Sequence, residues 1–214
     1  MKIPSDSSEA FNIAVVGAWN PAIFSPQWVK ENIADDQSKD VFMAFAFANA
    51  VPMPPRVTVD NINIYPSNQS LSLDCALYSD EHALTCTKKI RKICELLSHT
   101  PVSAIGFNFR FHAKIEESDV LTDLFTFADI AKIDAKKYSP GPSSVKRNFQ
   151  LGNSEFLNLA IEYLPEYVRF EFNFHSDLKS MTEIFDRVAG EKFLEKKAQA
   201  LEFLNSVYEL QLEE

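Results

Sequence analysis

Two short stretches of the chain combine the side-chain types that bind anions, hold metals or transfer protons. The first is FNFRFH, at Phe107–His112, and the second is FEFNFH, at Phe170–His175. Successive residues of a strand point to opposite faces, so each stretch separates its phenylalanines from its polar side chains. The polar side chains of the two stretches are Asn108, Arg110, His112, Glu171, Asn173 and His175.

These polar residues form a candidate ligand-binding site if the two strands are neighbours in one sheet. Arginine and histidine bind anions, and glutamate and histidine act as acids and bases. In that arrangement His112 and His175, which end the two stretches, are expected to approach each other, with Glu171 close to one of them. An ordinary solvated sheet face has the same alternation of polar and apolar residues, and it is the simpler interpretation.

Other chemistry is not indicated by the sequence. The five glycines, at positions 17, 106, 141, 152 and 190, are scattered, whereas a phosphate-binding loop needs clustered glycines. The histidines and the glutamate lack the local spacing of a metal site, so we expect no metal and no cofactor. Neither G-x-S-x-G nor H-E-x-x-H occurs in the chain, which favours a non-catalytic protein over an enzyme.

Charge and hydropathy narrow the classes of partner and location. A formal net charge of −9 and a pI near 5.0 argue against a general nucleic-acid-binding protein, because phosphates require a basic surface. No stretch has the roughly 20 apolar residues of a membrane span, and MKIPSDSSEA at the start is not a secretory signal. We therefore expect a soluble, cytoplasmic protein whose Cys75, Cys86 and Cys94 are reduced and buried.

Alternation and turn signals predict the strands. Asp60-Asn61 interrupts the alternation of one of them and predicts a β-bulge there. This strand, Val57–Tyr65, forms a hairpin with Leu71–Leu77 around PSNQS, and a second hairpin turns at Leu164-Pro165. The predicted strands are Phe11–Gly17, Val41–Ala48, Val57–Tyr65, Leu71–Leu77, Val102–Ile115, Glu155–Leu164 and Glu166–His175.

Apolar residues at helical spacing and capping residues predict the helices. Ser25 precedes a proline at the first helical position, and Ser176 with Asp177 occupies the place of a cap for a helix from Leu178 to Val188. The other predicted helices are Pro26–Ile33, Asp80–Leu97, Asp119–Phe127 and Glu191–Leu210. The basic residues Lys88, Lys89, Arg91 and Lys92 lie off the apolar stripe of their helix, which favours a solvated face over a site for an anionic partner.

The order of these elements predicts an α+β fold, with antiparallel sheet built from hairpins and helices packed on one face. The phenylalanine faces of the doubled strand need a cover, and the helices Asp80–Leu97 and Glu191–Leu210 are the natural cover. We expect a disordered segment at 1–8, a first half at 9–131, a loop or linker at 132–147, and a second half at 148–214 packed against the first. Whether the doubled strand marks two related halves is left open.

The sequence favours a non-catalytic protein-interaction or assembly subunit, whose partner is another protein or a second copy of the chain. High aromatic content, exposed hairpin edges and the lack of catalytic motifs support this interpretation. The alternative is a small-molecule sensor or enzyme that uses Arg110, His112, Glu171 and His175 on the polar sheet face.

Overall fold

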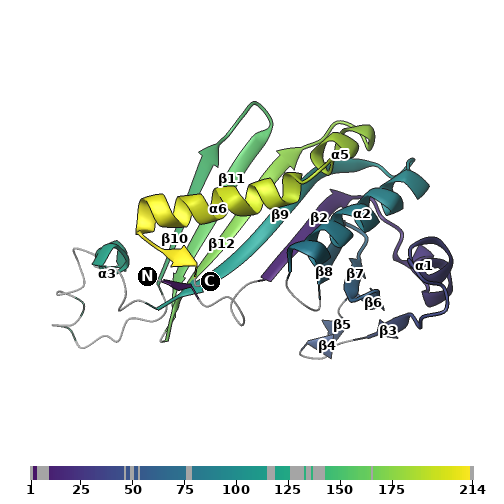
Figure 1. Cartoon of the computed structure of the whole chain (residues 1–214), viewed down its shortest axis with the longest axis horizontal. Coiled ribbons are helices and arrows are strands. Elements are labelled where there is room, and N and C mark those ends of the chain that lie inside the picture. The colour runs from purple at the N-terminus through teal and green to yellow at the C-terminus, as the bar shows by residue number, and fades with distance from the viewer. Residues whose placement is uncertain are drawn as a thin grey trace.

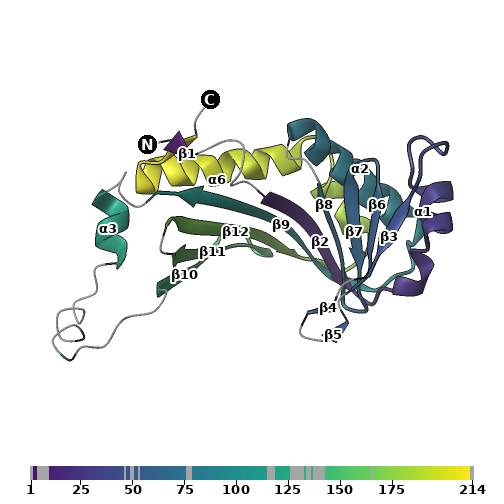
Figure 2. The same cartoon turned by 90° about the horizontal axis from the view of Figure 1, so that it is seen from below.

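Among the residues described, nine strands form one antiparallel sheet, and the helices pack mainly against one of its faces (Figures 1 and 2). This arrangement confirms the predicted α+β fold. The structure is a computed structural model that describes residues 2–3, 10–45, 47–48, 51–52, 54–75, 79–114, 119–125, 133, 136, 143–164 and 166–212.

The order of the strands across the sheet is not their order along the chain. The hairpin of β11 and β12 pairs with β9 through β12. On the other side of β9, β2 from the start of the chain separates it from β8, β7 and β6. In spatial order the strands are β10 (Ser143–Gln150), β11 (Glu155–Tyr163), β12 (Val168–Asp177), β9 (Val102–Ala113), β2 (Ala10–Gly17), β8 (Ser70–Cys75), β7 (Ile62–Pro66), β6 (Arg56–Val59) and β3 (Phe42–Ala44).

Helices α2 and α6 lie across one face of the sheet (Figure 2). The sheet is curved, and the face opposite these helices is the concave one. We call this second face the open face. Helix α1 packs on β6 and α5 packs on α2. Among the described residues, no helix is both long enough and apolar enough to cross a membrane. The helical segments are η1 (Pro21–Ile23), α1 (Pro26–Asn32), α2 (Asp80–Leu96), α3 (Asp119–Phe125), α5 (Thr182–Arg187) and α6 (Lys192–Tyr208).

The phenylalanines of the doubled strand lie under α6, as their alternation predicts. The ring of Phe193 on α6 lies 4.9 Å from that of Phe109 and 5.6 Å from that of Phe107. Farther along α6, the ring of Phe203 lies 5.8 Å from that of Phe172. Helix α2 covers β2, β8 and β7 instead. All six phenylalanines of the two stretches are buried, namely Phe107, Phe109, Phe111, Phe170, Phe172 and Phe174.

A two-residue turn replaces the bulge predicted at Asp60-Asn61. Val59 pairs with Ile62, and the two residues between them have φ angles of 50° and 62°. Positive φ at both central positions is the requirement of a type I′ hairpin turn, and aspartate and asparagine tolerate it better than most residues. The break in alternation therefore marks the reversal between β6 and β7.

Lys89 is the exception among the basic residues predicted to be solvated on α2. It is only 2% exposed, whereas Lys88, Arg91 and Lys92 are exposed. Its Nζ donates to Oδ2 of Asp60 at 2.7 Å and to the carbonyl oxygen of Ile33 at 3.1 Å. The side chain thus joins α2 to the β6–β7 turn and to the end of α1, a role that helical periodicity does not reveal.

The segment predicted to form one strand at Val41–Ala48 gives two short strands, β3 and β4 (Phe47–Ala48), and β4 pairs with β5 (Val51–Pro52). Ser176 and Asp177, predicted to cap a helix, end β12 instead, because both pair with β9. Helix α5 begins later, at Thr182, without a side-chain cap.

Two of the predicted segment boundaries are corrected by strand pairing. In the segment 1–8, predicted to be disordered, Lys2–Ile3 (β1) pairs in parallel with Gln211–Leu212 (β13). The loop predicted at 132–147 contains the first residues of β10, which pairs with β11 from Ser143 onward. The other residues of these two segments, apart from 133 and 136, lie outside the described part of the chain.

Candidate functional site

The two copies of the doubled strand are neighbours, as the candidate site requires, and they are antiparallel. Asn108 lies opposite Asn173, and Arg110 lies opposite Glu171. Antiparallel pairing places the ends of the two copies at opposite ends of the ladder. The predicted approach of His112 to His175 is therefore wrong, because His112 faces Arg169 and His175 faces Gly106.

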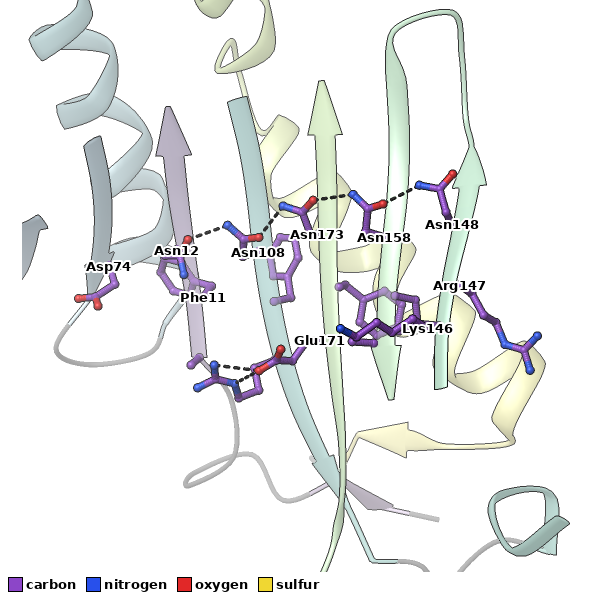
Figure 3. A pocket seen from close by; sticks show the side chains of 16 residues that line it. Phe11, Asn12, Asp74, Asn108, Lys146, Arg147, Asn148, Asn158, Glu171 and Asn173 are labelled. Carbon is purple, nitrogen blue, oxygen red and sulfur yellow. Dashed lines mark hydrogen bonds and ion pairs between the residues drawn. The ribbon is translucent and has the colours of Figure 1, made fainter. Parts of the chain in front are cut away.

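An unbroken row of asparagines crosses the open face. We call it the asparagine row; it consists of Asn12 (β2), Asn108 (β9), Asn173 (β12), Asn158 (β11) and Asn148 (β10). Each member is the register partner of the next. Hydrogen bonds from Nδ2 to Oδ1 join them in one direction, from Asn148 to Asn12, at 2.6, 2.9, 2.6 and 2.7 Å (Figure 3).

Strand geometry explains how the asparagine row forms. Neighbouring strands are about 4.8 Å apart, a separation that short amide side chains in register can bridge. Gly106 also makes room, since a Cβ at that position would lie 2.9 Å from Nδ2 of Asn173. Each amide has two donors and two acceptor positions, so the bonds within the row leave every amide able to donate or accept further.

Beyond Asn12 the row continues toward the β3 edge of the sheet, where a carboxylate and a hydroxyl group join the amides. Asp74 on β8 is the register partner of Asn12, and its Oδ1 accepts from Nδ2 of Asn63 at 2.8 Å. Asn63 Oδ1 in turn accepts from the hydroxyl of Thr58 at 2.8 Å. Within the described chain, no hydrogen bond joins Asn12 to Asp74, and the bonds on both sides are directed toward this junction.

A second row of side chains lies two residues along each strand from the asparagine row, and it contains three charged residues. It crosses from Ala10 to Arg110, Glu171, Ala160 and Lys146, again as register partners. Nε and Nη2 of Arg110 both lie 3.0 Å from Oε1 of Glu171. Lys146 makes no ion pair with the residues that the structure describes, and its side chain extends across the open face (Figure 3).

The two rows form the floor of a hollow in the open face, with a volume of about 750 Å³. Ala10 and Ala160 carry the smallest side chains of the floor, and they lie beside the Arg110–Glu171 pair. Four of the six candidate residues line this hollow, namely Asn108, Arg110, Glu171 and Asn173. Asp74, Lys146, Arg147 and the remaining asparagines of the row complete its polar lining.

The two histidines lie outside the lining of the hollow. Burial lowers the pKa of the His112 imidazole below its ordinary value, and the nearby Arg110 and Arg169 guanidinium groups lower the pKa further. Its Nε2 is buried without a hydrogen-bond partner among the described residues, and its ring lies 4.4 Å from that of Tyr167. At the other end, Nε2 of His175 lies 3.0 Å from Oδ1 of Asp177.

The sequence provided a signal for the residues that were missed. Asn12 and Asn158 each lie between two apolar residues of a strand, and Asn148 lies between Arg147 and Phe149. Asparagine is disfavoured in strands. That signal is weak in any one strand, and only the pairing of five strands makes it a row. Lys146 lies in the segment 132–147, which the sequence predicts to be a loop, and its place on the sheet face follows from the formation of β10.

Comparison with known proteins does not add a relative. No protein-family model matches the sequence, and the comparison with curated proteins gives no match either. Among the described residues, no three histidine, cysteine, aspartate or glutamate side chains are grouped in a way that could hold a metal ion. The chemistry of the hollow must therefore be inferred from its own side chains.

Proposed function

We propose that the protein binds a neutral, hydroxyl-rich small molecule, of the chemical class of sugars and polyols, in the hollow of the open face. The observation that carries this proposal is the asparagine row. Five amides in register along the floor offer donors and acceptors side by side, and a hydroxyl group both donates and accepts. The volume of the hollow lies within the range of about 300–1,000 Å³ that small-molecule sites occupy.

The charges of the hollow support a neutral ligand. Arg110 and Glu171 neutralise each other within the second row, so neither needs a charged ligand as a counter-ion. Asp74 and Lys146 have opposite charges, and five strand spacings separate β8 from β10. Arg147 also lines the hollow, but its guanidinium interacts with the hydroxyl of Tyr208 on α6. An anionic ligand would approach a chain with a net charge of −9, which opposes its association.

Removal of two central amides is expected to weaken binding by roughly 10- to 100-fold, because each lost hydrogen bond contributes about 0.5–1.5 kcal/mol. The variant is Asn158→Val with Asn173→Val, since valine favours strands and both positions belong to the open face. Thermal shift against monosaccharides, disaccharides, nucleosides and free amino acids identifies the binder. Titration calorimetry of parent and variant then measures the loss.

A matched control adds the same side chain outside the hollow. Ser144→Val lies on β10 and on the open face, but Ser144 does not line the hollow. This control is expected to keep the affinity of the parent. Equal affinity of the parent and the double variant for the binder would exclude the asparagine row as the site. Binding of nucleosides or amino acids without sugars would refute the ligand class and retain the hollow as a site.

A second function, a protein-interaction or assembly subunit, is favoured by the aromatic residues at the β3 edge of the sheet. Phe42 and Phe45 are 65% and 69% exposed, and β3 is the last strand of the nine. An edge strand offers unpaired backbone groups to a partner strand, and exposed aromatic side chains are typical of binding surfaces. The partner in this proposal is another protein or a second copy of the chain.

If two copies associate through this edge, the molar mass of the parent measured by light scattering is that of a dimer at high micromolar concentration. Phe42→Ser with Phe45→Ser is then expected to scatter as a monomer, because the substitutions remove the apolar contact and leave the core intact. Multi-angle light scattering after size-exclusion chromatography makes the measurement. A monomeric parent, or a variant that remains dimeric, rules out self-association through this edge.

A further inference from the structure

Two cysteines are in contact where β8 meets α2. Cys75 ends β8 and Cys86 lies in the first half of α2, and their Sγ atoms are 3.3 Å apart. Cys75 is half-buried and Cys86 is buried. Neither residue is required by the proposed ligand site, although Cys75 directly follows Asp74, which lines the hollow.

We propose that Cys75 and Cys86 form a redox site that is converted reversibly to a disulfide by a small-molecule disulfide such as oxidised glutathione. The Cys75 thiolate attacks one sulfur of oxidised glutathione, which forms a mixed disulfide and releases one glutathione thiolate. The Cys86 sulfur, after losing its proton, attacks Sγ of Cys75 and releases the second glutathione. The protons of the two protein thiols end on the two released glutathione molecules, and the two electrons reduce the glutathione disulfide.

The surroundings of the two sulfurs assign their order of reaction. Cys75 is the partly accessible thiol, so the oxidant reaches it first. The hydrogen bond with Cys75, together with burial, raises the pKa of the Cys86 thiol well above its ordinary value. Cys86 therefore keeps its proton and can donate it to Sγ of Cys75 until the mixed disulfide has formed. Because Cys86 is buried, a reducing thiol from solvent is expected to attack the Cys75 sulfur of the new disulfide.

Disulfide formation requires little movement of the protein. The sulfur atoms must approach from 3.3 Å to a bond length of about 2.05 Å, which side-chain rotation can provide. The bond joins the end of β8 to α2 across a short loop, so it restricts the unfolded chain and is expected to raise the melting temperature. Cys94 is buried on the same helix, but among the described residues no hydrogen bond joins its sulfur to that of another cysteine, so it has no partner for a disulfide.

The test incubates the full chain with oxidised glutathione and counts free thiols after denaturation. The parent has three cysteines, and we expect a single reactive thiol after oxidation, together with a peptide pair that links Cys75 to Cys86. Cys94→Ser is expected to form the same link. Cys86→Ser is expected to stop at a glutathione adduct on Cys75, without the rise in melting temperature that the parent shows on oxidation.

The parent protein alone decides the proposal, even if a variant does not fold. Three thiols remaining after oxidation, a bond that includes Cys94, or a stable glutathione adduct without the internal bond would each overturn it. Reduction of the oxidised parent by dithiothreitol is expected to restore all three thiols and the original melting temperature. Because no ligand of the hollow enters this experiment, its outcome is separate from that of the proposed function.

Discussion

Replacement of Phe172 by alanine is expected to lower the free energy of unfolding by about 3–5 kcal/mol, the range for truncation of a buried aromatic residue. Phe172 is 1% exposed, and its ring lies 5.9 Å from that of Phe111 and 5.8 Å from that of Phe203. The substitution removes contacts to β9 and to α6 at once and leaves a cavity between the sheet and the helix.

Phe109→Ala is expected to have a similar effect, because Phe109 is 2% exposed and contacts the ring of Phe193 on α6. Urea unfolding followed by circular dichroism provides the measurement for both variants. Phe42→Ala is the matched control; its side chain is 65% exposed, so a change of no more than about 0.5 kcal/mol is expected. Melting of both core variants within a degree or two of the parent would contradict the burial of the phenylalanine face.

Replacement of Lys89 by methionine is expected to cost about 3 kcal/mol, because it leaves a buried carboxylate without its cation. The Asp60 carboxylate that accepts from Lys89 is only 10% exposed. A second carboxylate, that of Asp35, has its Oδ2 3.2 Å from Nζ of Lys89 but is 71% exposed. Most of the expected loss in the free energy of unfolding therefore comes from the Lys89–Asp60 pair. The control is Lys88→Met, since Lys88 is exposed at the preceding position of the same helix. Its replacement should change the free energy of unfolding little.

The effect of Lys89→Met is expected to depend on pH. Burial raises the pKa of Asp60, but hydrogen bonds from Lys89 and from the Asp35 amide outweigh it, so the folded-state pKa lies below the ordinary value. A lowered carboxyl pKa contributes stability that is fully present above the unfolded-state pKa of about 3.9 and is lost as the pH falls through the folded-state pKa.

In the variant, burial acts on Asp60 without the lysine, and protonation of the carboxyl group removes the penalty of an unpaired charge. The stability difference between the parent and Lys89→Met should therefore be largest near neutral pH and should narrow as the pH falls below about 4. Denaturant unfolding at several pH values tests this. A difference that is constant with pH would indicate that Lys89 acts through packing of its side chain and not through its charge.

The sequence alone was sufficient for the properties that depend on neighbours along the chain. Alternation in FNFRFH and FEFNFH identified the buried phenylalanine faces, because strand side chains repeat with a period of two wherever the strand is placed. Helical spacing and capping residues similarly predicted α1, α2 and α6 within a few residues. The α+β fold follows from the order of these elements, which needs no knowledge of their pairing.

Only the tertiary structure decided which side chains meet. Strand order and register depend on pairing between distant segments, and a shift of one residue would move a side chain to the other face. The asparagine row exists because β10, β11, β12, β9 and β2 are aligned in one register, and Asn12 and Asn108 are 96 residues apart in the chain. Antiparallel pairing likewise separated His112 from His175.

Lys89 shows the same limit on a helix. Periodicity placed it among solvated residues, but the position of the β6–β7 turn and of the end of α1 created a buried acceptor pair beside it. Local patterns record whether a residue suits a helix or a strand. They do not record which oxygen atoms the rest of the chain brings within reach, and in this protein those contacts define both the buried lysine and the hollow.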